Sequence, residues 1–304
     1  MKLIRNLIII GVLIVVLGAG YYFATKYEPP TEHTDIPQEK TITLFDVNAD
    51  RVIKIVVKNT ADSFTLVKDG NGWKVEGKDY IELTGAVETY IYNFAKITAS
   101  EIIDEKPQDK AIYGLTEPQA EIAVSAEGVE KSFKIGSLDP TGNYYYVAED
   151  GKNTVYTVVK ANADAYFKRL NSLRSMTVTN IDTEDVRGIE IKSGSTALNV
   201  VRSDGGWDVK NPQAAAAQNK KFNEKLLTPL CKITANDIVE DNPADLSKYG
   251  FDKEVTVTVE NGTLTLYIGS ANGAYYIYPK GSVSVYSVGY DSIAFAYLTA
   301  QDIM

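Results

Sequence analysis

The chain contains the same landmarks twice, in the same order along the sequence. The segment Ile97–Ile103 reads ITASEII, and the segment Ile233–Val239 reads ITANDIV. The dipeptide Tyr113-Gly114 returns as Tyr249-Gly250, an offset of 249 − 113 = 136 residues. Short structural repeats recur every ~20–50 residues, so an offset of this size indicates a duplicated domain instead. The duplication therefore predicts two similar folding units joined in tandem.

Further matched positions extend the repeat over most of the chain. The offset falls to 304 − 176 = 128 between Met176 and Met304, which indicates shorter loops in the second copy, where length changes cost little. We predict copies at residues 41–178 and 179–304, each close to the usual domain size of about 100–150 residues. The matched positions that mark turns and cores are Trp73 and Trp207, Pro107 and Pro243, Tyr113 and Tyr249, Gly114 and Gly250, and Gly136 and Gly269.

The N-terminus has the pattern of a membrane-spanning helix. Lys2 and Arg5 precede Leu7–Thr25, a run of 19 residues without a charged side chain. A helix of that length spans roughly 28 Å, enough for the hydrocarbon core of a bilayer. Because basic residues favour the cytoplasmic side, we predict that residues 1–26 are a single-pass anchor in a bacterial cell membrane, with a cytoplasmic N-terminus and both copies outside. The alternative is a cleaved signal peptide, with Gly18 and Gly20 at the cleavage site.

The segment that follows, residues 27–40, is polar and contains Pro29, Pro30 and Pro37, so we predict an extended linker. The formal net charge of −9 disfavours nucleic acid and anionic lipid headgroups as partners of the body. Cys231 is the only cysteine, which excludes an internal disulfide and requires a hydrophobic core in each copy.

Within each copy the pattern predicts an α+β fold with mainly antiparallel sheet. β-branched and aromatic residues alternate over short segments with hairpin-length joins, and no βαβ alternation occurs. A helix is predicted over residues 85–97, and its counterpart should kink or restart at Pro229. We also predict a short helical turn with Pro107 or Pro243 near its first position and Gly114 or Gly250 just past its end. A closing helix is predicted over residues 162–174.

The residue inventory excludes several kinds of catalytic site. His33 is the only histidine and lies in the linker, so the folded body has no Ser-His or Cys-His pair and no histidine-metal site. Cys231 aligns with Ala95 on an apolar helix face, as expected for a buried structural cysteine. No phosphate-binding glycine loop, CxxC pair or hydrolase elbow is present, and we predict no cofactor.

Aromatic clusters are the candidate binding residues. Trp73 and Trp207 follow a hairpin turn in both copies and read as core residues, with a sugar-stacking platform as the alternative. Adjacent side chains of a strand face opposite sides, so tyrosine runs should place some rings outside the core, where they could bind polysaccharide or a protein, although ordinary sheet packing also explains them. The tyrosines concerned are Tyr144, Tyr145, Tyr146, Tyr275, Tyr276 and Tyr278.

Carboxylates also recur in both copies. Such a set suits a cation site or a glycosidase pair, but an exposed strand edge leading into a capped turn explains it equally and is the interpretation that we favour. The matched residues are Glu101, Asp104, Glu105 and Asp109 in the first copy, and Asp237, Glu240, Asp241 and Asp245 in the second.

The ordered motifs resemble a known family. Each copy runs from Gly-Trp-Lys/Asp-Val through a helix, Tyr-Gly-Leu/Phe, Ile-Gly-Ser and Tyr-Tyr-Val/Ile to Val-Tyr-Thr/Ser-Val. This order is similar to the bacterial membrane-anchored family called domain of unknown function 4340. The resemblance implies an envelope protein encoded near ABC transporters of the gliding-motility auxiliary type, and it carries over no catalytic or binding residues.

From these observations we expect a non-enzymatic, membrane-tethered interaction module outside the cell membrane, an accessory of such a transport system with an envelope protein as partner. One alternative is a glycan- or cell-wall-binding module that uses the tyrosine-bearing strands. The other is a carboxylate-dependent glycosidase. Since the matched positions are those of cores and turns, specific binding should use unmatched surface or the junction between the copies.

Overall fold

The computed structural model describes residues 41–304. The predicted anchor (1–26) and linker (27–40) lie outside the described residues. In the described part, no helix has the length and apolar character needed to cross a membrane. All the elements below belong to the compact unit Ile42–Met304.

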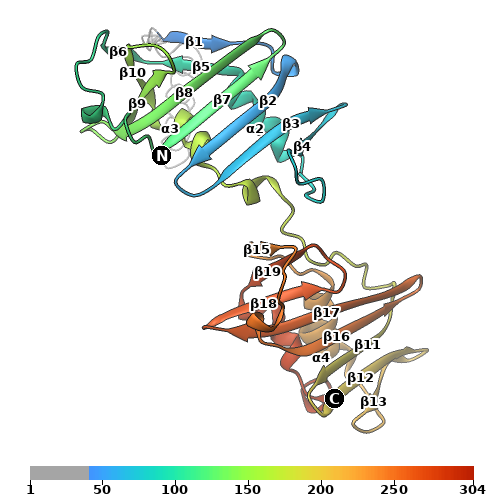
Figure 1. Cartoon of the computed structure of the whole chain (residues 1–304). Helices are drawn as coiled ribbons and strands as arrows, with labels where there is room; N and C mark the ends of the chain where they lie inside the picture. Colours follow the sequence, from blue (N-terminus) through green and yellow to red (C-terminus); the bar gives the residue numbers. More distant parts are fainter. Residues whose placement is uncertain (1–40) are drawn as a thin grey trace, which may run out of the picture. The chain divides into compact units, whose positions relative to one another are not determined.

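The first half of this unit is built on an eight-stranded antiparallel sheet (Figure 1). Along the sheet the strands follow the order β4-β3-β2-β7-β8-β9-β10-β6. Their alternation of buried and partly exposed residues gives one face to the core, most regularly in β7. The bounds are β2 Val52–Asn59, β3 Ser63–Asp69, β4 Gly72–Val75, β6 Glu101–Asp104, β7 Ala120–Ala126, β8 Val129–Leu138, β9 Tyr144–Glu149 and β10 Val155–Val159.

The second half repeats this sheet with the same order of equivalent strands, β14-β13-β12-β11-β16-β17-β18-β19-β15, in which the two-residue β14 is the addition. The registers also agree: Asn59 pairs with Ala120 where Ser193 pairs with Lys253. The bounds are β11 Val186–Ser193, β12 Thr196–Ser203, β13 Gly206–Asn211, β14 Ala215–Ala216, β15 Asp237–Asp241, β16 Phe251–Val259, β17 Gly262–Ala271, β18 Ala274–Pro279 and β19 Ser284–Val288.

A small ladder accompanies each large sheet. In the first half β1 (Ile42–Asp46) pairs with β5 (Lys96–Ala99). In the second half the amide of Val178 donates to the carbonyl of Ile233 at 2.9 Å. Met176 and Val178, which precede the predicted boundary at 178/179, already pack against the second core.

Helices cover one face of each sheet. Helix α2 (Ala86–Ala95) packs its apolar side, including Tyr90 and Phe94, against the first sheet. Its counterpart runs through α4 (Asn219–Phe222), the π-helical η5 (Asn223–Leu227) and α5 (Thr228–Cys231). The wide π turn lies directly before Pro229, whose ring has no N–H and collides with the carbonyl four residues earlier in a regular α-helix.

The predicted closing helix over 162–174 is wrong. The segment divides into α3 (Lys160–Ala163), η3 (Asp164–Phe167) and η4 (Leu170–Leu173), with extended backbone at Lys168 and Arg169. Backbone carbonyls of this segment form hydrogen bonds with a residue distant in sequence and not with the next helical turn. The side-chain amide of Asn59 donates to the carbonyls of Tyr166 and Lys168. The second half closes with α6 (Tyr290–Ile293), η7 (Ala294–Tyr297) and α7 (Ala300–Ile303).

The predicted turn exists in both halves, as η2 (Ala111–Tyr113) and η6 (Ser247–Tyr249). Gly114 and Gly250 end these turns in the left-handed region, at φ 68° and 63°. The predicted position of the prolines is wrong, since Pro107 and Pro243 lie before the turn. Asp109 and Asp245 cap it instead, each accepting a backbone N–H at 2.8 Å. With these corrections, the prediction of mostly antiparallel sheet with a few packed helices is confirmed.

Candidate functional site

The six tyrosines of the sequence prediction are engaged in packing. Tyr145 is buried against Phe167, with ring centroids 4.9 Å apart, while the other five are partly buried. Tyr146 and Tyr276 lie edge-on to the turn tyrosines Tyr113 and Tyr249, each at 5.0 Å. Tyr144, Tyr275 and Tyr278 lie in the same strands. Tyr275 also packs on Tyr290, which is 47% exposed, with ring centroids 5.5 Å apart.

The two tryptophans differ in burial. Trp207 lies in the second core at 6% exposure, with its ring 4.5 Å from that of Phe222. Trp73 is only partly buried against the first core. Both tryptophans therefore pack against a hydrophobic core, and Trp207 is the more deeply buried of the two.

The recurring carboxylates lie apart, on edge strands and in turns. Asp104 accepts from the Tyr113 hydroxyl at 3.3 Å, and Glu240 pairs with Lys248 at 2.6 Å. Residues 41–304 contain no group of three acidic, cysteine or histidine side chains placed to hold a metal ion. Cys231 is buried, and this burial raises the pKa of its thiol to about 11, which keeps it protonated and unreactive.

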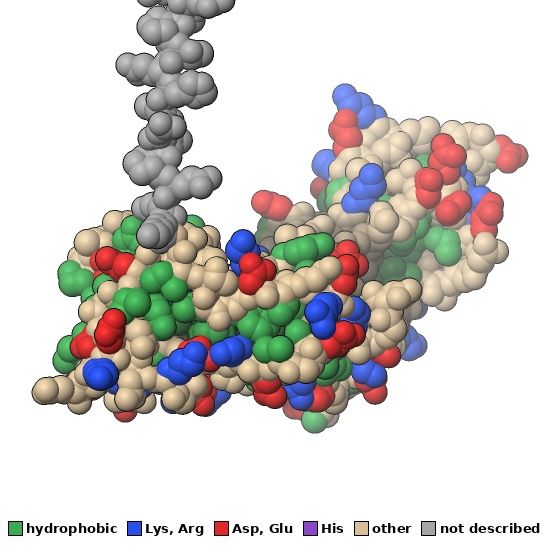
Figure 2. All heavy atoms as spheres, turned by 90° about the horizontal axis from the view of Figure 1, so that it is seen from above, with side chains coloured by type: hydrophobic (Ala, Val, Ile, Leu, Met, Phe, Trp, Pro, Cys, Tyr) green, Lys and Arg blue, Asp and Glu red, His purple; other side chains and the backbone are tan. Residues whose placement is uncertain are grey.

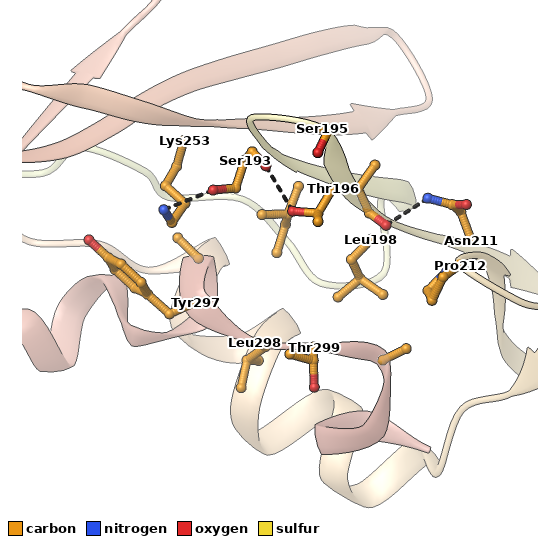
Figure 3. Close-up of a pocket in the computed structure, with 14 residues that line it drawn as sticks. Ser193, Ser195, Thr196, Leu198, Asn211, Pro212, Lys253, Tyr297, Leu298 and Thr299 are labelled. Atoms are coloured by element: carbon orange, nitrogen blue, oxygen red, sulfur yellow. Dashed lines mark hydrogen bonds between the residues drawn. The ribbon is translucent and has the colours of Figure 1, made fainter.

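A cavity of about 520 Å³ opens in the second half, between the β11–β12 turn and the closing segment (Figure 3). The turn side contributes mostly hydroxyls and the closing segment contributes mostly apolar side chains. The lining residues are Ile191, Ser193, Ser195, Thr196, Ala197, Leu198, Asn211, Pro212, Lys253, Ala296, Tyr297, Leu298, Thr299 and Ala300. Its size is that of an ordinary ligand site.

The equivalent place in the first half is filled by aromatic rings. The hydrogen bond from Lys168 N to Ala165 O matches that from Leu298 N to Phe295 O, so Tyr166 stands where Ala296 stands. Tyr166 is 3% exposed, and its ring lies 5.3 Å from that of Phe94. The second half has alanine at this place, and Ala296 lines the cavity.

Polar contacts also close the first half and leave the second open. Asn59 donates to Tyr166 O at 3.1 Å, and Asp62 accepts from Leu170 N at 2.8 Å, so the turn is fastened to the closing segment. The equivalent residues in the second half are Ser193 and Thr196. They form a hydrogen bond within the turn, in which Thr196 Oγ1 donates to Ser193 O at 2.8 Å.

Lys253 supplies the charge at one end of the cavity. Its side chain is 10% exposed, and its ammonium donates to Ser193 Oγ at 3.0 Å and to Asp252 at 2.7 Å. The ammonium also lies 4.8 Å from the centre of the Tyr297 ring, which points toward it in Figure 3. Burial, followed by the nearby Asp252 charge, raises the pKa of Tyr297, so this phenol remains neutral.

The fourteen lining residues combine an amine, hydroxyl donors and acceptors, and an apolar wall. The amine of Lys253 is paired with Asp252 at 2.7 Å. The sequence prediction missed this site. The signal was the contrast between matched copies, in which Asn59 and Tyr166 face Ser193 and Ala296.

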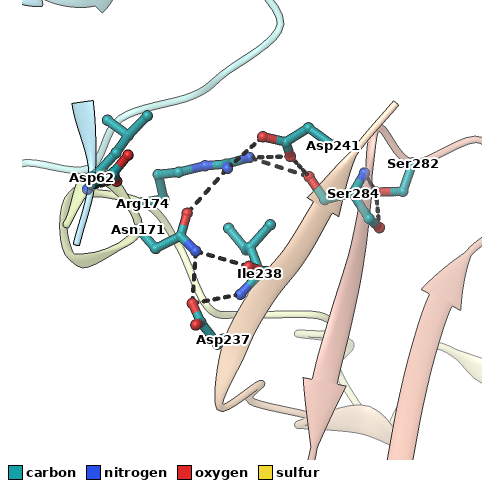
Figure 4. A network of polar contacts seen from close by, with 9 residues as sticks. Asp62, Asn171, Arg174, Asp237, Ile238, Asp241, Ser282 and Ser284 are labelled. Atoms are coloured by element: carbon teal, nitrogen blue, oxygen red, sulfur yellow. Dashed lines mark hydrogen bonds and ion pairs between the residues drawn. The ribbon is translucent and has the colours of Figure 1, made fainter. Parts of the chain in front are cut away.

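A second polar centre joins the two halves (Figure 4). Arg174, with a side chain 7% exposed, donates two hydrogen bonds of 2.9 Å to Asp241 and one of 3.2 Å to Ser284. Asn171 donates to Asp237 at 2.7 Å and to the carbonyl of Ile238 at 2.8 Å. The end of the first half is thereby bound to edge strand β15.

These contacts hold the carboxylates ionised. Burial opposes ionisation of Asp241, but the hydrogen bonds from Arg174 and Ser284 outweigh it and lower the pKa below its usual value. Asp237 behaves in the same way: burial is opposed by hydrogen bonds from Arg169 and Asn171, and its pKa is lowered. These two recurring carboxylates thus belong to the junction of the halves.

Comparison with known proteins assigns the family. The model of the family named domain of unknown function (DUF4340) matches residues 84–239 and 207–304, two overlapping segments that together span most of the chain. No curated protein matches the chain, and no solved structure does. The duplicated motifs and the family match agree, and the protein belongs to the DUF4340 family.

Proposed function

We propose that the protein is a non-enzymatic interaction module, held outside a bacterial cell membrane by residues 1–26 as a single-pass anchor. Its two halves are tandem homologous domains, a proposal supported by the identical order of equivalent strands. Its partner is an envelope protein of an ABC transport system of the gliding-motility auxiliary type. Family membership and the uncharged N-terminal run support this assignment.

One observation carries the binding function: the cavity in the second half has a filled counterpart in the first. A cavity beside a core costs stability, since its lining loses packing contacts, and an occupant restores them. Ala296 and Ser193 line this opening where Tyr166 and Asn59, which are hydrogen-bonded to each other, stand in the first half, and Lys253 adds a charge where the first half has Ala120. The difference between two otherwise similar domains supports residues 193–198 and 296–300 as the proposed binding site.

The lining suits a segment of polypeptide. The apolar wall of Leu198, Pro212 and Leu298 would take an aliphatic or aromatic side chain. Ser193, Ser195 and Thr196 would bind the backbone of that segment, and Lys253 would meet a carboxylate or a carbonyl.

A glycan is the second candidate, because hydroxyls and an amide gather beside a partly exposed ring. Tyr297 is 37% exposed, and Asn211 lies on the opposite wall. The cavity is thus a second candidate place for a glycan, beside the tyrosine-bearing strands.

A photo-crosslinking amino acid at Ser195, in the full chain in native membranes, tests the proposal. The matched control is the same residue at Ala61, the equivalent turn position of the closed first half. We expect adducts at position 195 alone, containing a component of the transport system by mass spectrometry. Equal adducts at both positions would rule out the cavity as the site, and adducts with cell-wall glycan would favour the second candidate.

A further inference from the structure

The two large sheets end in equivalent edge strands. β6 pairs with β10 and β15 pairs with β19, each as the last strand of its sheet. Ile102 lies opposite Tyr156, and Ile238 lies opposite Tyr286 at the same register. The outer edges of β6 and β15 therefore offer the same backbone geometry to a neighbour.

In the second half this edge is covered. The segment Arg169–Arg174 lies along β15, where the Asn171 amide donates to the Ile238 carbonyl at 2.8 Å. The two arginines of the segment bind Asp237 and Asp241. Ile238 is 6% exposed as a result.

Within residues 41–304, no segment lies along the same edge of the first half in the way that Arg169–Arg174 lies along β15. Ile102 is 45% exposed and its neighbour Ile103 is 38% exposed, while Ile112 on the adjacent turn is 70% exposed. Glu101 and Glu105 are exposed as well, and within residues 41–304 neither has an ion-pair partner. Figure 2 shows hydrophobic side chains lying among both acidic and basic ones on the first half.

The acceptors that hold the covering segment on β15 are also present at β6. By the strand pairing, Glu101 takes the place of Asp237, and Glu105 follows β6 as Asp241 ends β15. Thr154 precedes β10 as Ser284 begins β19, so a hydroxyl is available beside the second carboxylate. The carboxylates, the hydroxyl residue and the edge strand are thus repeated at β6, and no segment of residues 41–304 is bound to them.

We propose that β6 docks a segment of a partner protein that carries two arginines around an asparagine, with the spacing of Arg169, Asn171 and Arg174. The arginines pair with Glu101 and Glu105, and the asparagine amide binds the outward carbonyl of Ile102. The apolar residues of the segment cover Ile102 and Ile103. This surface is separate from the cavity of the second half, and docking at one does not require the other.

A second copy of the chain is a poor occupant. Its Arg169–Arg174 segment is already bound to its own β15. The equivalent closing segment of the second half has Thr299, Gln301 and Met304 where the first has Arg169, Asn171 and Arg174. This closing segment lacks both arginines, so it would not pair with Glu101 and Glu105. The edge of β6 therefore fits a segment of a different protein better than a second copy of this chain.

The probe is the peptide YFKRLNSLRSM, residues 166–176, labelled and titrated onto the full chain in detergent while fluorescence anisotropy is recorded. We expect one bound peptide per chain and weaker binding at higher salt. The double variant Glu101→Lys, Glu105→Lys should raise the Kd about tenfold or more, as should replacement of both peptide arginines by alanine. The matched control is Glu117→Lys, Glu130→Lys, the same charge change at exposed positions away from β6.

Equal Kd values for the two double variants would overturn the proposal, as would a wild-type chain that does not bind the peptide. Sedimentation of the full chain tests the other occupant: self-association lost in Glu101→Lys, Glu105→Lys alone would assign β6 to a second copy and reject a separate partner. Cavity crosslinking at Ser195 has its own readout, so the two proposals fail independently.

Discussion

The guanidinium of Arg174 faces the carboxylate of Asp241 with two parallel hydrogen bonds of 2.9 Å. This fork-to-fork geometry, with Ser284 as a third partner, occurs where the first half ends. Leu173, one residue earlier, is buried in the first core. Two consecutive residues therefore fix the chain to two different sheets.

Replacing Arg174 by alanine should destabilise the protein strongly. Asp241, whose side chain is 16% exposed, would lose its charge partner; breaking a fully buried pair costs about 3–5 kcal/mol, and we expect a loss toward the lower end of that range. The measurement is chemical denaturation of residues 41–304. The control is Arg51→Ala, which removes an exposed pair with Glu127 and should cost ~1 kcal/mol or less. Similar losses in both variants would mean that the junction adds little to stability.

The junction should weaken in acid. The folded pKa values of Asp237 and Asp241 lie below the usual value of 3.8, so ionisation stabilises the folded state above that pH. This contribution is lost as the pH falls through the folded pKa values. Hydrogen exchange of β15 amides between pH 5 and about pH 2 should show accelerated opening at the acid end. Asp241→Asn should flatten this dependence, and an unchanged profile in that variant would speak against the mechanism.

Ala296→Tyr should close the cavity and abolish crosslinking at Ser195. The new ring would enter the place that Tyr166 occupies in the first half, where the lining of the second half leaves about 520 Å³. The reciprocal variant Tyr166→Ala removes a ring that is 3% exposed and should cost about 3–5 kcal/mol by analogy with other aromatic truncations. Crosslinking yield and the denaturation midpoint are the two measurements. Retained crosslinking in a folded Ala296→Tyr protein would place the partner outside the cavity.

Trp207 should contribute more to the stability of the folded protein than Trp73. Trp207→Ala should cost about 3–5 kcal/mol, because the ring is 6% exposed and packs on Phe222. Trp73→Ala should cost clearly less, since Trp73 is partly exposed. Denaturation midpoints of the two variants provide the comparison. Equal losses would show that exposure in the folded state is a poor guide at this position.

The sequence predicted the elements whose causes are local. The apolar spacing of α2, the alternation in β7 and the left-handed glycines Gly114 and Gly250 all depend on neighbours within a few residues. The closing helix was predicted wrongly for the opposite reason. Its backbone is held by Asn59 and Asp62, which are more than a hundred residues away in sequence, and apolar periodicity carries no information about them.

The cavity was not predicted, because the sequence comparison used the positions that are alike in the two copies, and the cavity depends on residues that differ. Tyr166 and Ala296 fall at unmatched positions, and the difference acquires meaning only when the hydrogen bonds of η3 and η7 show that they are equivalent. The junction was expected to be a place of binding. Its chemistry required the structure, since Arg174 and Asp241 meet across a sequence separation of 67 residues.

The step from Leu173 to Arg174 also determines how the protein would respond to tension. Leu173 accepts from the Thr84 amide at 2.8 Å inside the first half, and Arg174 binds Asp241 in the second. A pull applied between the two halves would therefore load this peptide unit, the two arginine–aspartate pairs and the hydrogen bonds of Asn171 before it stretched any sheet. A body built in this way would transmit force between its halves through a short coupling of ion pairs and hydrogen bonds.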